Sequence, residues 1–121
     1  MEIVYFAPPI PQILYTGDKK STFRVTGSEE IKRIVPGTSL SLRLLTDHEF
    51  ARVICNKTKI TTFAELTEED WKGHERFASV EEMLQIYSNW EKRAITLDTE
   101  LKIIGFNYRN FFPQVLRQYN Q

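Results

Sequence analysis

Apolar and polar residues alternate along several short segments, and this period of two predicts β-strands. The alternation is clearest after the Pro36-Gly37 turn, where leucines occupy every second position of residues 39–44 and one strand face should be buried. A longer segment that follows is rich in β-branched residues, which are typical of strands. The predicted strands are Glu2–Phe6, Ser21–Val25, residues 39–44, Glu49–Thr61 and Leu101–Phe106.

Helical spacing replaces this alternation in the second half of the chain. Ser79 with Glu82 is typical of a capping box, and Thr67 with Asp70 predicts a shorter helix before it. Behind Ser79 an apolar stripe recurs at helical spacing, and we expect it to face the core. The stripe consists of Val80, Met83, Leu84, Tyr87 and Trp90.

Weaker sequence patterns predict three further helical segments. Ser28–Ile34 reads as one helical turn that begins at Ser28, and Gln12–Tyr15 as a short turn that ends at Gly17. Asn110 is a candidate cap for a last helix, in which Pro113 falls in the first turn, where proline is tolerated. The apolar face of that helix would contain Phe111, Phe112, Val115, Leu116 and Tyr119.

Strands followed by two helices, a strand and a final helix indicate an α+β fold. Closing several short strands into a small mixed β-barrel protects their edges, so we expect a barrel with helices grouped between the later strands. The 121 residues fit one domain, 1–121, with residues 107–121 as a C-terminal helical extension.

Composition narrows the choice of partners. Lys plus Arg and Asp plus Glu both number 16, so the net charge is zero, whereas a general nucleic-acid binder usually carries a basic excess. Any nucleic-acid contact should therefore be local, or the ligand small.

No apolar stretch approaches the length of a membrane span, and the first residues lack the basic start of a signal peptide. A single cysteine, Cys55, and two histidines predict no internal disulfide, no metal site and a cytoplasmic protein.

The segment Gly17–Arg24 holds the candidate chemistry. Lys20, Thr22 and Arg24 should share one strand face, while Phe23 points the other way into the core. A hydroxyl beside cations is a candidate site for an anion or a carbonyl group. The alternative is a solvated hairpin edge with ordinary surface charges.

The pattern Gly17-x-Lys19-x-x-Thr22-x-Arg24 resembles the G-x-K-x-x-[TE]-x-R signature of the ASCH family, whose members have a PUA-like barrel. The resemblance covers about Ile3 to Phe106. Within that family, the small bacterial 4-acetylcytidine amidohydrolases carry the threonine form of the motif, as this chain does. The resemblance thus implies an amidohydrolase that needs no cofactor and cleaves an amide through an acyl-threonine intermediate.

Three catalytic roles follow from this resemblance. Lys19 would act as the base, Thr22 as the nucleophile, and a glutamate as the proton donor. That glutamate is assigned to Glu75, in Gly73-His74-Glu75-Arg76, although an ungapped alignment places His74 there instead. A lysine of lowered pKa is able to take the threonine proton.

The substrate-binding residues expected are Arg24, Lys20, Tyr5 and Trp71, the last two as surfaces that stack on a base. Trp90 is expected to lie in the core. The function expected first is hydrolysis of an acylated cytosine nucleoside. A non-catalytic RNA-binding module using the same face is the alternative, and an accessory domain that binds a partner through its last helix is a third. The oligomeric state is left open.

Overall fold

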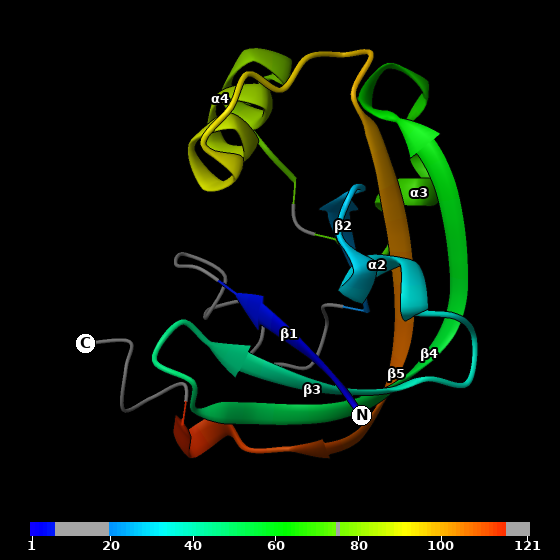
Figure 1. Ribbon diagram of the computed structural model, residues 1–121, viewed down its shortest axis with the longest axis vertical. Helices are drawn as coiled ribbons and strands as arrows, with labels where there is room; N and C mark the ends of the chain where they lie inside the picture. Colours follow the sequence, from blue (N-terminus) through cyan, green and yellow to red (C-terminus); the bar gives the residue numbers. More distant parts are fainter. Residues whose placement is uncertain (7–19, 75, 116–121) are drawn as a thin grey trace.

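The computed structural model describes residues 1–6, 20–74 and 76–115, which form a five-stranded sheet with two of the helices towards one end (Figure 1). The strand order is β1-β3-β4-β5-β2; β1 pairs with β3 in parallel, and the other pairs are antiparallel. β1 and β2 form the two edges of this curved sheet, so it is a half-barrel of mixed type. The predicted α+β class is confirmed. The strands are β1 (Glu2–Phe6), β2 (Ser21–Val25), β3 (Ser39–Leu44), β4 (Glu49–Thr62) and β5 (Glu100–Phe111).

The helices begin where the sequence places caps. α2 (Glu29–Arg33) begins after Ser28, and α3 (Glu68–Trp71) has both hydrogen bonds of its Thr67–Asp70 capping box. α4 (Val80–Glu91) is capped by Ser79, but the Glu82 carboxylate accepts its bond from the Ala78 N–H and does not complete a box. A 3₁₀ turn, Phe63–Glu65, follows β4. The predicted turn Gln12–Tyr15 lies outside the described residues.

The end of β5 corrects the prediction for the C-terminal segment. β5 does not end at Phe106 but continues to Phe111, and Asn110 pairs with Arg52 of β4 instead of capping a helix. Residues 107–111 of the expected helical extension are therefore strand. The long β4 offers these residues backbone hydrogen-bond partners, and this non-local pairing outweighs the local cap signal. Helical residues then appear at 113–115.

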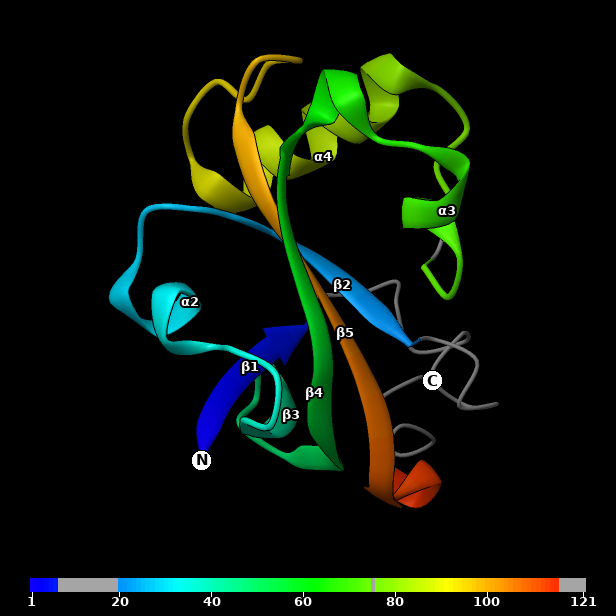
Figure 2. The same cartoon turned by 90° about the vertical axis from the view of Figure 1, so that its right-hand side faces the viewer.

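Two apolar cores lie along β4 and β5. Figure 2 shows this pair of long strands running side by side through the molecule. The first, here called the barrel core, lies between β1, β3, β4 and β5 and contains Phe6, Leu40, Leu42, Phe50 and Phe106 among others. The second, the helical core, lies beneath α4. Its buried members are Phe23, Val25, Phe63, Met83, Tyr87, Ile95, Leu101 and Ile103.

Two polar features lie among the buried residues. The Lys102 ammonium donates to the backbone carbonyls of Ile31 and Ile34, at 2.8 and 2.5 Å, and so holds the carbonyl end of α2 on the sheet. Cys55 is buried, and burial raises the pKa of its thiol. No helix among the described residues is long and apolar enough to span a membrane.

Candidate functional site

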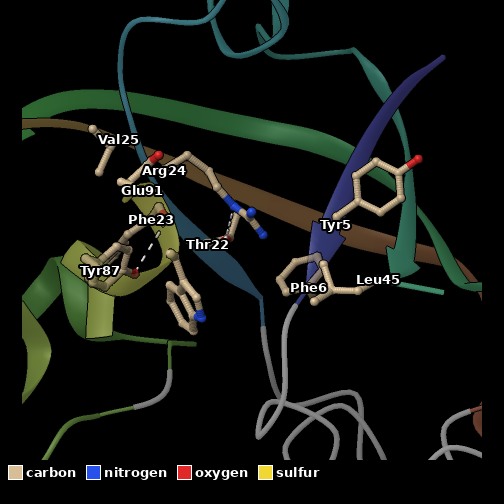
Figure 3. A pocket seen from close by; sticks show the side chains of 10 residues that line it. Tyr5, Phe6, Thr22, Phe23, Arg24, Val25, Leu45, Tyr87 and Glu91 are labelled. Carbon is tan, nitrogen blue, oxygen red and sulfur yellow. Dashed lines mark hydrogen bonds between the residues drawn. The ribbon is translucent and has the colours of Figure 1, made fainter. Parts of the chain in front are cut away.

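Thr22 and Arg24 lie together on one face of β2, as the alternation predicts. Thr22 is 4% exposed, and its Oγ1 accepts a hydrogen bond of 3.0 Å from Arg24 Nε. The Arg24 guanidinium carbon lies 4.6 Å from the centre of the Phe6 ring, which belongs to β1 (Figure 3). The arginine side chain therefore extends from one edge strand of the sheet towards the other.

A pocket of about 310 Å³ lies at this gap between the sheet edges (Figure 3). β2 provides its floor, β1 one wall and the last turns of α4 the other. Most of its lining is apolar or aromatic, and its polar groups include the Thr22 hydroxyl, the Arg24 guanidinium and the Glu91 carboxylate, which suits a planar ligand with polar substituents. The lining residues are Tyr5, Phe6, Thr22, Phe23, Arg24, Val25, Leu45, Tyr87, Trp90 and Glu91.

Among the predicted binding residues, the structure places Tyr5 in this pocket with Thr22 and Arg24. The Tyr5 hydroxyl donates to Asp47 at 2.9 Å, and this hydrogen bond raises the pKa of Tyr5. Lys20 is exposed and does not line the pocket. Trp71 lines a separate hollow with Phe77 and Arg76. Lys19 and Glu75 lie outside the described residues.

Gly73, two residues before Glu75, is hydrogen-bonded to the start of β2. Its carbonyl oxygen accepts from the backbone N–H groups of Lys20 and Ser21, at 2.7 and 3.2 Å. Gly73 has a φ of +75°, and a Cβ there would lie 3.0 Å from Lys20 Cβ. Only glycine fits this close approach without strain. Gly73 is thus held against the start of the strand that carries the candidate nucleophile.

His74, the alternative to Glu75, packs on the face of β2 opposite Thr22. Its ring stacks on Phe23 with centroids 3.8 Å apart and planes 12° apart, and Trp71 meets it edge-on. His74 is buried and does not line the pocket. Its place is therefore in the aromatic packing of the helical core.

Sequence reasoning misplaced Trp90 and missed Glu91. Trp90 is 40% exposed and faces the pocket, although the apolar stripe predicted it in the core. It lies in the last turn of α4, where Tyr87 packs edge-on against it with ring centroids 5.2 Å apart. The charged run Glu91-Lys92-Arg93 after this tryptophan indicates that Trp90 lies near solvent, but it does not indicate a pocket.

The described residues hold no group of three His, Cys, Asp or Glu side chains that suits a metal ion. No family model matches the sequence, and no curated protein matches it either.

Solved structures, in contrast, share the fold. A DUF984-family protein from Enterococcus faecalis V583 superposes with a TM-score of 0.69 at 13% identity, over 85% of this chain and 71% of that one. An ASCH domain from Lactobacillus crispatus JV V101 gives 0.64 at 10% identity, over 88% and 78%. A protein from Pyrococcus furiosus, solved in solution, gives 0.59 at 16% identity, over 91% and 98%. The chain therefore has an ASCH-type, PUA-like fold.

Proposed function

We propose that this chain is an amidohydrolase that removes the acyl group from an acylated cytosine nucleoside such as 4-acetylcytidine. The observation that carries the proposal is the Thr22 hydroxyl, which lies in an aromatic-walled pocket with the Arg24 guanidinium on it. The resemblance of Gly17-x-Lys19-x-x-Thr22-x-Arg24 to the ASCH signature supports the same assignment. The ASCH-type fold agrees with it but does not by itself define an activity.

The hydrogen bond between Thr22 and Arg24 leaves the Thr22 hydroxyl proton free to be transferred to a base. Oγ1 accepts from Arg24 Nε, so its own proton remains available for donation to a base. Lys19 is proposed as that base. Thr22 Oγ1 then attacks the acyl carbonyl carbon, and the remaining N–H groups of Arg24 stabilise the oxyanion that forms.

The rest of the reaction releases both products. The bond between the carbonyl carbon and N4 breaks, and Glu75 is proposed to protonate the leaving amine, so cytidine departs. Water then attacks the acyl-threonine ester, which gives the free carboxylic acid and restores Thr22. No oxidant, reductant or metal is needed to balance these steps.

The walls of the pocket suit a nucleoside better than a nucleic-acid chain. Trp90, which is exposed, offers an aromatic surface for a pyrimidine. Several cations among the described residues are already paired with carboxylates, which weakens any field that would attract phosphates. The pairs are Arg33–Glu2, Arg43–Asp47, Arg52–Glu49, Lys59–Asp70, Lys72–Glu69 and Arg76–Glu68.

The test measures the release of cytidine from 4-acetylcytidine by chromatography. We expect Thr22→Val, which keeps the side-chain shape, to lower kcat/KM by about 10³-fold or more, and Thr22→Ser to retain part of the activity. Lys19→Ala and Glu75→Ala test the base and the acid. Thr26→Val is the matched control, because the Thr26 hydroxyl donates to Glu100 and does not line the pocket.

Absence of cytidine release by folded wild-type protein would overturn the proposal. Labelled single-stranded RNA would then be titrated at two salt concentrations. Binding that weakens steeply with salt and is lost in Arg24→Ala would favour the RNA-binding module.

A further inference from the structure

Glu91 is an acidic side chain in the Thr22 pocket that the reaction above does not use. It is the last residue of α4 and is exposed. Among the described residues it forms no ion pair and no side-chain hydrogen bond, whereas Glu2, Glu49 and Glu68 are all paired with arginines. Because this carboxylate accepts nothing from the described part of the chain, it is available to a ligand.

Glu91 lies between the Thr22 pocket and a second hollow. It lines the Thr22 pocket and also a second, wider groove of about 630 Å³, whose walls include Thr26, Ser28 and Arg93. Figure 3 shows Glu91 on the α4 side of the pocket, close to β2. A ligand that fills the pocket and projects beyond it would therefore pass Glu91.

The shape of an acylated cytosine nucleoside fits this boundary. Its N4 acyl group and its N1 sugar leave opposite ends of the pyrimidine ring, so a base that presents its acyl group to Thr22 directs its sugar away from Thr22. Trp90 is the stacking surface next to Glu91 in the chain. Glu91, at the end of α4, is then the acidic group of the pocket lining that is available to this sugar.

We propose that Glu91 binds the 2′- and 3′-hydroxyl groups of the substrate ribose, so that the site selects ribonucleosides over 2′-deoxyribonucleosides. This inference rests on the proposed function and defines its substrate class. A carboxylate has two oxygens that accept hydrogen bonds, and the two vicinal hydroxyls of ribose supply two donors. The same pairing of an acidic side chain with ribose hydroxyls occurs in dinucleotide-binding folds.

The experiment compares kcat/KM for 4-acetylcytidine and 4-acetyl-2′-deoxycytidine. We expect the wild type to prefer the ribonucleoside by about tenfold or more, chiefly through KM, since a hydrogen bond to a charged group is worth about that factor. Glu91→Gln should remove most of this preference. Glu81→Gln is the matched control, because Glu81 is exposed on the same helix and does not line the pocket.

Binding of cytidine and 2′-deoxycytidine, measured by calorimetry, separates this inference from the proposed function. Tighter binding of cytidine that is lost in Glu91→Gln supports the ribose subsite even if neither acylated nucleoside is hydrolysed. Hydrolysis of both substrates with equal kcat/KM overturns the subsite and leaves the amidohydrolase standing. A ribonucleoside preference that Glu91→Gln does not change also overturns it, as does the failure of the wild type to bind either nucleoside.

Discussion

At the scale of single residues, the shape of the Arg24 side chain matters as much as its charge. Its Nε holds Thr22 while the planar guanidinium lies over Phe6, and a lysine reproduces neither contact. We expect Arg24→Lys to lower kcat/KM for 4-acetylcytidine by about 10- to 100-fold. Its melting temperature should stay within a few degrees of the wild type. Arg109→Lys, at an exposed position outside the pocket, should change neither quantity.

Asp70 links the start of α3 to β4 and makes stability depend on pH. Burial raises its pKa, but hydrogen bonds from the Thr67 backbone and from Lys59 outweigh this, so the pKa lies below its ordinary value. A lowered pKa in the folded state means that the ionised form stabilises the fold. This contribution is complete at neutral pH and is lost as the pH falls through the folded pKa.

Asp70→Asn should therefore lower the free energy of unfolding by about 1–2 kcal/mol at pH 7. The difference from the wild type should begin to shrink below about pH 4, where Asp70 of the unfolded chain is protonated, and should vanish once the folded carboxyl, with its lowered pKa, is protonated too. Urea unfolding at several pH values measures both. A difference that stays constant down to pH 2 would show that the charge of Asp70 has no part in it.

Local alternation was enough to predict the shared face of Thr22 and Arg24 and the burial of Phe23, because successive residues of a strand point to opposite sides. Trp90 and Glu91 could not be assigned in this way. They reach the pocket only because α4 packs across the edge of β2, and such non-local packing is invisible in a window of one helix. Their helical spacing gave a periodicity but not the point where the core ends.

At the scale of elements, the loop between α3 and α4 is positioned by Gly73. Gly73→Ala brings a Cβ to 3.0 Å from Lys20 Cβ at a backbone φ of +75°. We expect it to lower stability by about 1–2 kcal/mol. Amidohydrolase activity should also fall, because the loop must shift away from the strand that carries Thr22.

Gly37→Ala is the matched control for this prediction. Gly37 also has a positive φ, +95°, but a Cβ there meets nothing within 4 Å, and it does not line the pocket. It should lower stability through backbone strain alone and leave kcat/KM unchanged. Equal activity of the two variants would mean that the Gly73 contact does not position the site.

Strand and helix starts were predictable because caps and alternation are local signals, as at Ser28 and Thr67. The end of β5 was not. Residues 107–111 resemble the start of a helix in isolation, but β4 is long enough to continue the ladder to Phe111. The length of a strand depends on its pairing partner, so it cannot be predicted from the sequence of that strand alone.

At the scale of the whole molecule, the class was predictable but the pairing was not. The parallel pair of β1 with β3 places β1 at one edge of the sheet and leaves β2 at the other. The candidate site lies between these edges, so it is a consequence of topology. Nothing in the strand sequences indicates that Phe6 should approach Arg24, because that contact depends on how the entire sheet curves.

The two cores should unfold together, because β4 and β5 run through both. Phe50 is fully buried in the barrel core, so Phe50→Leu should lower the free energy of unfolding by about 1–2 kcal/mol. Both tryptophans, Trp71 and Trp90, lie at the helical end, so their fluorescence reports on that end alone, whereas far-ultraviolet circular dichroism reports on the whole chain. We expect the two signals to give the same urea midpoint in the wild type and to shift equally in Phe50→Leu. If only the dichroism shifted, the barrel core and the helical core would unfold separately. A ligand bound in the gap between β1 and β2 would then couple these two cores.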